Sequence, residues 1–307
     1  MRVFVNPWCS YGEGWKKWIR IEPFLRQRYG AFDVEKIRSP QSLPWQVKQA
    51  AGNGERVFIA AGGDGTVNLM VNTLFDLSLE ENAILGAVGL GSSNDFHKPY
   101  RKEASIHGIP VRIDWERASL SDVISVWYQN HRGRPLKRYC MINASVGITA
   151  EANALYNARI PFIKWIQKSS VEAAIMVSAL FTILTYRNMA CILRIGNSDP
   201  WPFSLTNLGV VKNPHFAGRL CYDTRVRKDD GKMGINLCYS MRKWEVIKTL
   251  CSLSRKKFRG LLKTRSWYSK EVEIASSLSF ALEMDGEVVQ ASWARFKILT
   301  KALRCCQ

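Results

Sequence analysis

Residues 1–118 alternate short apolar runs with amphipathic runs, a pattern typical of a parallel sheet with crossover helices. The apolar runs predict strands at 2–5, 32–37, 57–61 and 84–88. The amphipathic runs predict helices at 15–29, broken or kinked at Pro23, at 43–51 and at 66–75. We therefore expect an α/β domain built on a doubly wound parallel sheet over residues 1–118.

From residue 119 onward the pattern changes to that of a mainly antiparallel, β-rich domain. Strands are predicted at 139–144, 190–195, 203–211, 235–239, 271–275, 280–284 and 294–299. Helices are predicted at about 150–156, 169–186 and 242–258. We assign this second domain to residues 119–292.

The composition supports two folded domains and excludes a disordered or fibrous chain. The 307 residues are 47% hydrophobic and 23% charged, which provides enough apolar side chains for real cores. The eight cysteines form no CxxC pair and most lie in apolar runs, so reduced, buried thiols are expected.

The charge balance favours an anionic partner. There are 44 Lys and Arg against 26 Asp and Glu, a net charge of +18. Nucleic acid, phosphorylated ligands and anionic membrane surfaces all fit this excess. The apolar run 173–186 is shorter than the ~20 residues that a membrane-spanning helix needs, and no export signal is visible. We expect a cytoplasmic protein that associates peripherally with membranes.

One segment combines positive charge with apolar side chains. Residues 254–270 carry seven Lys or Arg and no acidic residue, interleaved with Phe258, Leu261, Leu262, Trp267 and Tyr268. Each cation near an anionic bilayer contributes ~1 kcal/mol, and the apolar side chains could enter the interface. A solvated face and a nucleic-acid patch fit the same segment, but no recognisable nucleic-acid-binding motif accompanies it, and nucleic acid is not expected.

The first chemical signal is a glycine-rich turn between a predicted strand and a predicted helix. Residues 57–61 are followed by Gly62-Gly63-Asp64-Gly65-Thr66. Such a turn presents backbone N–H groups and the positive end of a helix dipole to a phosphate. A carboxylate beside phosphates needs a cation or a transferable proton between them, so Asp64 indicates metal-assisted phosphate chemistry. The pentapeptide also fits a tight turn in which Asp64 caps the helix.

A second turn of this kind follows the next predicted strand. Residues 84–88 lead to Gly89 and Gly91 and then to Ser92-Ser93-Asn94-Asp95. Adjacent carboxyl-end loops of a parallel sheet can converge on one nucleotide. Asn94 and Asp95 equally fit a cap of a following helix.

These motifs, with others downstream, resemble the diacylglycerol kinase catalytic-domain family, which includes sphingosine kinases and bacterial lipid kinases. The motifs that carry the resemblance are Asn6-Pro7, Gly62 to Asn68, Gly91 to Phe96, Asp229-Asp230-Gly231 and Asp285-Gly286-Glu287. The resemblance extends from Val3 to about Leu299. It implies a phosphofructokinase-like nucleotide-binding domain, a β-rich lipid-substrate domain and an active site in the cleft between them. It also implies that residues 293–307 return to pack on the first domain.

The resemblance assigns roles to individual residues. The candidates for holding ATP are Asn6, Ser39, Gly62, Gly63, Asp64, Gly65, Thr66, Val67, Asn68 and Ser92. Asp230, with backbone groups at Arg227 and Lys232, matches the family's structural magnesium site. Glu287 matches the proposed proton acceptor, at the tip of a predicted hairpin in which Asp285-Gly286 is a strong turn signal. Phosphoryl transfer requires a nucleotide held in line, cation charge on the phosphates and a carboxylate to take the hydroxyl proton, which agrees with these roles.

The chain departs from the family pattern at two places. Leu69 stands where an acidic residue is common, and Ser92-Ser93 stand where a Thr with a small neighbour is usual. Both Asp64 and Glu287 are retained. We predict an ATP- and Mg²⁺-dependent lipid kinase acting on a lipid alcohol such as diacylglycerol or a sphingoid base. Glu287 is the expected base, and Asp64 is its metal or hydroxyl partner and the second candidate for the base. The alternatives are a soluble NAD kinase-like enzyme and a nucleotide-binding pseudokinase. A homodimer is compatible with the sequence.

Overall fold

The computed structural model describes residues 1–98, 105–130, 133–158, 160–217 and 219–307. The chain divides into two compact units, one of Met1–Val123 with Thr300–Gln307 and the other of Ile124–Leu299. The sequence placed the boundaries slightly earlier, at 118 and 292. In the structure, strands β7 (Ser119–Gln129) and β17 (Glu287–Cys305) each run through a boundary without interruption.

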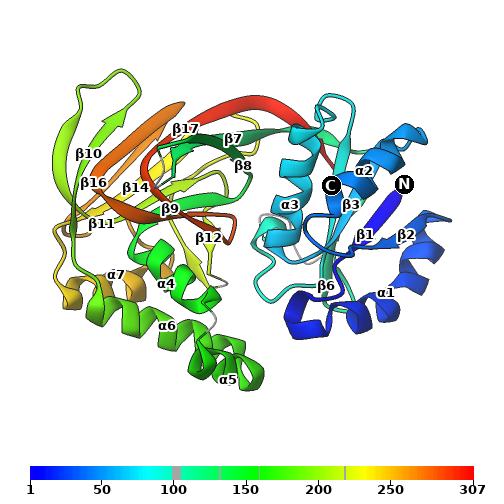
Figure 1. The fold of residues 1–307 in the computed structure, drawn as a ribbon, viewed down its shortest axis with the longest axis horizontal. Coiled ribbons are helices and arrows are strands. Elements are labelled where there is room, and N and C mark those ends of the chain that lie inside the picture. Colours follow the sequence, from blue (N-terminus) through cyan, green and yellow to red (C-terminus); the bar gives the residue numbers. More distant parts are fainter. Residues whose placement is uncertain (99–104, 131–132, 159, 218) are drawn as a thin grey trace. The chain divides into compact units, whose positions relative to one another are not determined.

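In the described part of the first unit, strands β2, β1, β3 and β4 lie side by side in this order and run parallel (Figure 1). The strands are β1 (Arg2–Val5), β2 (Asp33–Lys36), β3 (Val57–Gly62) and β4 (Ile84–Gly89). The last residues of β17 pair in parallel with the start of β4, and β6 (Ile109–Arg112) pairs antiparallel with its end. A short strand, β5 (Ser105–Ile106), pairs with β6. All four predicted strands are confirmed.

Among the described residues of this unit, three α-helices accompany the sheet, and each was predicted. They are α1 (Gly14–Tyr29), α2 (Leu43–Gly52) and α3 (Asp64–Asp76). Helix α1 continues through Pro23 and buries Trp18, Ile21 and Leu25 against β1 and β3. Helix α3 buries Val67, Met70, Val71 and Leu74, the face that the 3.6-residue spacing predicted.

The second unit is rich in antiparallel strands, as expected (Figure 1). Besides most of β7 and β17, its larger strands are β8 (Pro135–Cys140), β9 (Asn143–Gly147), β10 (Met189–Ile195), β11 (Trp201–Val211), β14 (Met233–Tyr239), β15 (Thr264–Ser269) and β16 (Glu271–Met284). A two-stranded ladder joins β12 (His215–Phe216) and β13 (Leu220–Cys221). Inward-facing residues of these strands form one apolar core.

Two strand predictions need correction. The strand predicted at 139–144 is two strands, because the N–H groups of Met141 and Ile142 donate to the carboxylate of Asp285 instead of to a neighbouring strand. The strands predicted at 271–275 and 280–284 are one strand, β16, whose pairing with β17 shifts register between Ala275 and Phe280.

The described residues of the second unit form the α-helices α4 (Ile148–Asn157), α5 (Pro161–Ser169), α6 (Val171–Thr185) and α7 (Lys243–Ser254). Helix α5 was not predicted, and α7 ends at Ser254 instead of continuing to 258. Within the described ranges, no helix combines the length and apolar character needed to cross a membrane.

Candidate functional site

Three turns that follow parallel strands are bonded together in the first unit. The turn after β3 and the turn after β4 pack backbone against backbone, since a Cβ placed on Gly91 would lie 2.5 Å from the Cα of Gly63. The N–H of Leu90 donates to the carbonyl of Gly62 at 2.8 Å. The glycines at 63 and 91 are therefore required by this close approach of two turns, before any ligand is considered.

The turn after β1 joins the same assembly. The amide Nδ2 of Asn6 donates to Oγ1 of Thr66 at 2.9 Å, across from β1 to the first turn of α3. The Oγ of Ser10 donates to the carbonyl of Leu90 at 2.7 Å. The structure thus brings Asn6, the 62–68 turn and the 89–96 turn to one edge of the sheet, as the strand order predicts for carboxyl-end loops.

Asp64 binds the second turn directly. Its Oδ2 accepts the N–H of Asp95 at 3.0 Å and its Oδ1 accepts the N–H of Phe96 at 2.9 Å. The carboxylate therefore caps the short 3₁₀ helix η2 (Asp95–His97) as well as standing at the start of α3. The carboxylate therefore stands where the turns after β3 and β4 meet.

Three further candidates for nucleotide binding, Gly62, Val67 and Asn68, lie at the end of β3 and in α3. Gly62 ends β3 under the side chain of Thr66, and a Cβ there would lie 2.2 Å from Oγ1. Val67 and Asn68 are buried in α3, and Oδ1 of Asn68 accepts the Nδ2 of Asn72 at 3.1 Å. The side chains of these two residues therefore hold the helix in place.

The other two candidates lie in turns. Ser92 is exposed in the turn after β4. Ser39 exchanges hydrogen bonds with Ser42 just before α2, where its Oγ accepts the N–H of Ser42 at 3.1 Å. This contact belongs to the start of α2, where Ser42 occupies the N-cap position.

One cation that binds these turns, Lys17, was not among the site residues predicted from the sequence. Lys17 of α1 donates from Nζ to Oγ of Ser10 at 2.9 Å and to the carbonyl of Leu90 at 3.1 Å. It also lines a pocket of about 410 Å³, together with Arg20, Phe24, Gly91, Asn94 and His107 among others. Its position in an exposed-looking run of the sequence, beside Lys16, gave no signal of this contact.

Two buried residues, Arg112 and His97, lie beside the second turn. Arg112 of β6 donates to the carbonyls of Phe96 at 3.1 Å and Cys306 at 3.2 Å. His97 lies nearby in η2, and burial together with the positive charge of Arg112 lowers the pKa of its imidazole to about 3. His97 is therefore neutral at physiological pH.

In the second unit, the carboxylates of Asp285 and Glu283 hold the turn between β16 and β17 in place. The buried carboxylate of Asp285 accepts the N–H groups of Met141 at 2.9 Å, Ile142 at 2.9 Å and Asn143 at 3.0 Å. Glu283, also buried, accepts the Oγ–H of Ser145 at 2.8 Å and the N–H of Gly286 at 2.6 Å.

This support leaves Glu287 at the tip. Its side chain is exposed at the first position of β17. Asn153 and Asn157 of α4 donate to the carbonyl of Gly286, at 3.2 and 3.3 Å, and fix the turn from the other side. The predicted hairpin is confirmed, and of its three acidic residues Glu287 is the one presented to solvent.

The residues predicted to hold a structural magnesium ion do not fit one. The carboxylate of Asp230 accepts the N–H groups of Arg227 at 3.3 Å and Lys232 at 3.2 Å. The ammonium of Lys212 lies 2.5 Å from Oδ1 of Asp230. Across the described ranges, His, Cys, Asp and Glu form no group of three or more that could hold a metal ion.

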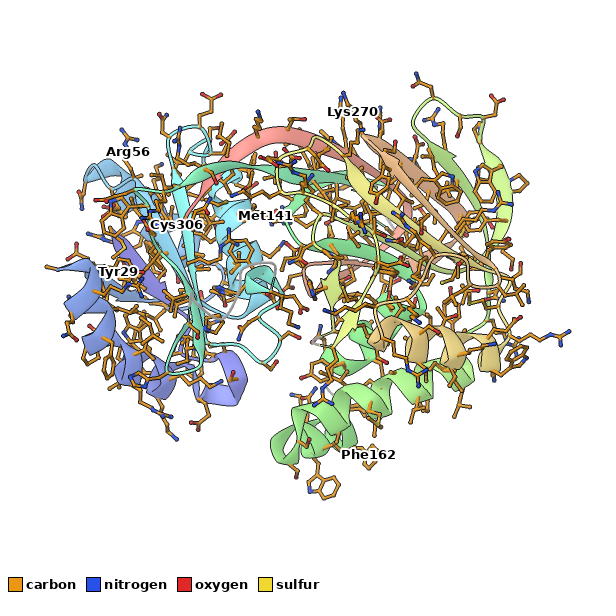
Figure 2. All side chains as sticks on the ribbon, turned by 180° about the vertical axis from the view of Figure 1, so that it is seen from behind. Tyr29, Arg56, Met141, Phe162, Lys270 and Cys306 are labelled. Atoms are coloured by element: carbon orange, nitrogen blue, oxygen red, sulfur yellow. The ribbon has the colours of Figure 1, made fainter. Side chains whose placement is uncertain are left out.

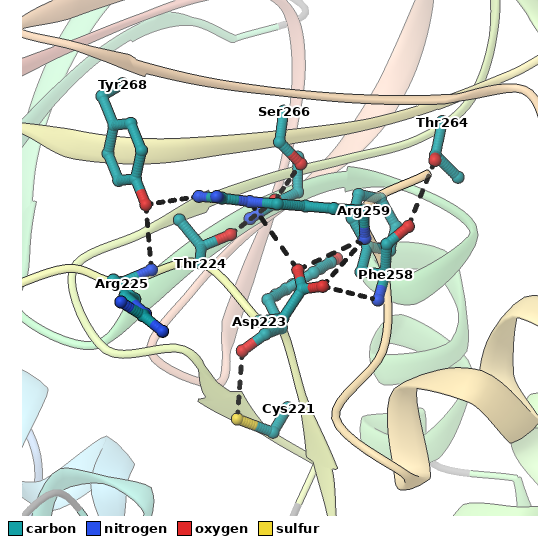
Figure 3. A network of polar contacts seen from close by, with 11 residues as sticks. Cys221, Asp223, Thr224, Arg225, Phe258, Arg259, Thr264, Ser266 and Tyr268 are labelled. Carbon is teal, nitrogen blue, oxygen red and sulfur yellow. Dashed lines mark hydrogen bonds and ion pairs between the residues drawn. The ribbon is translucent and has the colours of Figure 1, made fainter. Parts of the chain in front are cut away.

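The basic segment 254–270 is packed into the second unit, of which it is a part, more closely than the sequence suggested (Figure 3). Phe258 is fully buried, and the carboxylate of Asp223 accepts the N–H groups of Phe258 at 3.2 Å and Arg259 at 3.0 Å. The hydroxyl of Tyr268 accepts the N–H of Arg225 at 3.0 Å. Insertion of Phe258 into a membrane is therefore ruled out, and Trp267 packs against the core.

Comparison with known proteins finds similarity to one protein family. The model of the diacylglycerol kinase catalytic domain matches residues 1–121. A protein named "Probable lipid kinase YegS" from Escherichia coli O1:K1 / APEC is 25% identical over 271 residues, covering 84% of this chain and 80% of that one. The protein of the same name from the K12 / DH10B strain is 24% identical over the same length.

Solved structures agree in fold. A structure described as "a putative diacylglycerol kinase from Bacillus anthracis str. Sterne" has a TM-score of 0.70 at 16% identity and covers 99% of this chain and 96% of that one. Another structure, of a diacylglycerol kinase from the same organism, has a TM-score of 0.65 at 13% identity, with coverage of 99% and 95%. The two-unit, sheet-rich architecture is therefore the fold of these structures.

Proposed function

We propose that the protein is an ATP-dependent lipid kinase, because residues 1–121 match the model of the diacylglycerol kinase catalytic domain, the family that the sequence motifs resemble. It transfers the γ-phosphate of ATP to the hydroxyl of a lipid alcohol, such as diacylglycerol or a sphingoid base. The observation that carries the proposal is the joining of the 62–68 and 89–96 turns at one edge of the matched domain, with Asp64 between them.

The two turns are suited to the phosphates of ATP. Their glycines allow close approach, and α3 directs its N-terminal dipole to the same point. We propose that this unit is a phosphofructokinase-like, doubly wound domain, and we assign the nucleotide to it. Mg²⁺ would neutralise charge on the transferring phosphate. Asp64 is our candidate to hold it, because its carboxylate stands where the two glycine-rich turns meet.

Glu287 is the proposed general base. A base must be within hydrogen-bond reach of the substrate hydroxyl, so it must be exposed yet held in one place. Glu287 meets both requirements, because its side chain is exposed while Asp285, Glu283 and the α4 amides fix the turn that carries it.

A kinase assay tests this function. The purified protein is incubated with labelled ATP, Mg²⁺ and a lipid extract in mixed micelles, and the labelled product is identified. We expect a phosphorylated lipid whose formation is lost in E287Q, whereas E81Q, which removes an exposed carboxylate of the first unit, keeps wild-type activity. Formation of a labelled product without lipid would indicate an NAD kinase-like enzyme. Nucleotide binding without any transfer would indicate a pseudokinase.

We place the action of the enzyme at an anionic membrane surface, and the described helices of the second unit support this. Apolar side chains of α5, α6 and α7 are exposed; they are Phe162, Trp165, Met176, Leu180, Phe181, Leu184, Trp244 and Ile247. We call this set the helical apolar face. Phe162 and Trp165 are 60% and 66% exposed, and their rings stack with centroids 6.4 Å apart. Figure 2 shows aromatic side chains of α5 standing away from the ribbon near the labelled Phe162.

The charges around this face suit an anionic bilayer. Lys164, Arg242, Lys243 and Lys248 are exposed on or beside the same helices. The acidic side chain described on α7, Glu245, is buried and paired with Lys263 at 2.7 Å. Aromatic and aliphatic side chains surrounded by cations are characteristic of helices that lie in a membrane interface. The exposed residues Arg255, Lys256 and Lys257 follow α7 directly and extend the positive charge.

A further inference from the structure

A buried ammonium occupies the turn to which the family resemblance assigns a divalent cation. Strand β11 ends at Val211, which is paired with Gly234 near the start of β14. Lys212 is the next residue, so its side chain leaves β11 beside the turn that precedes β14. That side chain is 2% exposed. Its Nζ lies 2.5 Å from Oδ1 of Asp230 and 2.8 Å from the carbonyl oxygen of Lys232.

These two oxygens are the kind of ligands that a hard cation binds. Mg²⁺ takes carboxylate and carbonyl oxygens at 2.0–2.1 Å. The same pair of oxygens here accepts hydrogen bonds from Lys212, and the N–H groups of Arg227 and Lys232 donate to the same carboxylate. Burial alone would raise the pKa of Asp230, but these bonds and the Lys212 charge outweigh it and lower the pKa. A divalent ion on Oδ1 of Asp230 would have to displace the ammonium of Lys212. The positive charge of that ammonium would also repel the ion.

We propose that Lys212 is the resident cation of this turn and replaces the structural divalent ion. One ammonium neutralises one carboxylate and bridges it to a carbonyl, which closes the turn over residues 227–232 without magnesium. The proposal does not depend on which reaction the protein catalyses. It concerns a cation separate from any Mg²⁺ that accompanies ATP.

Backbone hydrogen bonds also connect Lys212 to the hairpin that carries Asp285, Gly286 and Glu287. The N–H groups of Lys212 and Asn213 both donate to the carbonyl of Ile142 at 2.8 Å. The N–H of Ile142 in turn donates to Asp285. The backbone of Lys212 is therefore bonded to the segment that holds the Asp285-Gly286-Glu287 hairpin.

Measurements on the nucleotide-free, full-length protein test the proposal without using activity. We expect the thermal midpoint of the wild type and the amide exchange of Arg227 and Lys232 to be the same in EDTA and in millimolar Mg²⁺. A clear loss of stability in EDTA that Mg²⁺ restores would overturn the proposal, since the turn would then depend on a divalent ion.

Variants supply the second arm. K212S removes the ammonium and leaves space beside Asp230, so we expect a midpoint about 5 °C lower and a Mn²⁺ site detectable by electron paramagnetic resonance. Added Mg²⁺ should recover most of the lost midpoint. K232S is the matched control, because Lys232 uses only its backbone here and its side chain is exposed. K212R, which keeps the charge, covers the case in which K212S does not fold, and we expect it to remain insensitive to EDTA. A K212S midpoint equal to that of K232S, or an equal Mn²⁺ site in the wild type, would overturn the proposal.

Discussion

The carboxylate of Asp64 accepts the backbone N–H of Phe96 at 2.9 Å, which links the two glycine-rich turns through one side chain. The same carboxylate accepts the N–H of Asp95. Asp64 therefore has a structural duty in addition to the proposed role toward Mg²⁺, and its substitution should affect both stability and catalysis.

D64N tests the two duties together. The Asn side chain keeps one acceptor oxygen and replaces the other with an NH₂ group, so one of the two N–H groups loses its partner. We expect the free energy of unfolding of the first unit to fall by about 1–3 kcal/mol, with loss of phosphoryl transfer. Chemical denaturation and the kinase assay measure these. The control is D76N, which changes an exposed aspartate at the other end of α3 and should cost less than about 0.5 kcal/mol. Unchanged stability in D64N would refute the structural duty.

G91A should separate the two turns. The added methyl group would lie 2.5 Å from the Cα of Gly63, and backbone cannot move aside as a flexible side chain can. We expect a loss of about 1–3 kcal/mol in stability and at least a tenfold weaker ATP affinity by calorimetry. G52A is the control, because a Cβ on Gly52 meets no atom within 4 Å and that residue is helical. ATP affinity in G91A equal to the wild type would remove the turns from the nucleotide site.

Local patterns predicted the first unit well because its strands and helices follow simple periods. β1 has the predicted bounds, and the buried face of α3 is the predicted one. β7 was missed because Ser121, Asp122 and Ser125 are buried polar residues that break the alternation of a half-buried strand. α5 was missed because Phe162 and Trp165 face solvent, which contradicts the rule that apolar residues mark the interior.

The candidate site could be predicted only where residues adjacent in sequence make it. The 62–68 turn is such a case. Asp285 was assigned to a turn correctly, but its bonds to Met141, Ile142 and Asn143 join segments more than 140 residues apart, and no local pattern records them. Lys212 gave a weak signal, as a charged residue directly after the apolar end of a strand.

D285N should disturb the hairpin that carries Glu287. Asp285 is 4% exposed, and its two oxygens accept three N–H groups, of which an Asn oxygen can satisfy only part. We expect a loss of about 2–3 kcal/mol in stability and a lower kcat with little change in the KM for ATP, since the nucleotide is assigned to the other unit. Steady-state kinetics at saturating lipid measure the split. A rise in the KM for ATP with kcat intact would contradict this assignment.

His97 should make the first unit less stable in mild acid. Burial lowers the pKa of His97 from 6.5 to about 3, so the folded protein keeps it neutral while the unfolded chain binds a proton below pH 6.5. Stability is therefore lost as the pH falls from 6.5 towards 3, by roughly 2 kcal/mol from this residue at pH 5. Denaturation curves at pH 7 and pH 5 measure the difference, and H97Q should show a smaller one. An identical pH dependence in H97Q would contradict the prediction.

Substitutions on the helical apolar face should release the protein from membranes. The large side chains of Phe162 and Trp165 are exposed, so their replacement by Ser removes apolar contact with a bilayer and little contact within the fold. We expect F162S/W165S to bind vesicles of mixed neutral and anionic phospholipid at least about tenfold more weakly, without ATP present. W45S is the matched control, because Trp45 of the first unit is 55% exposed and lies outside this face. Binding of the wild type should fall with salt and on neutral vesicles, where the surrounding cations lose their partners. If F162S/W165S sediments with vesicles as the wild type does, the protein binds membranes through a surface other than the helical apolar face. Kinase activity on a short-chain soluble lipid would still test the proposed reaction separately.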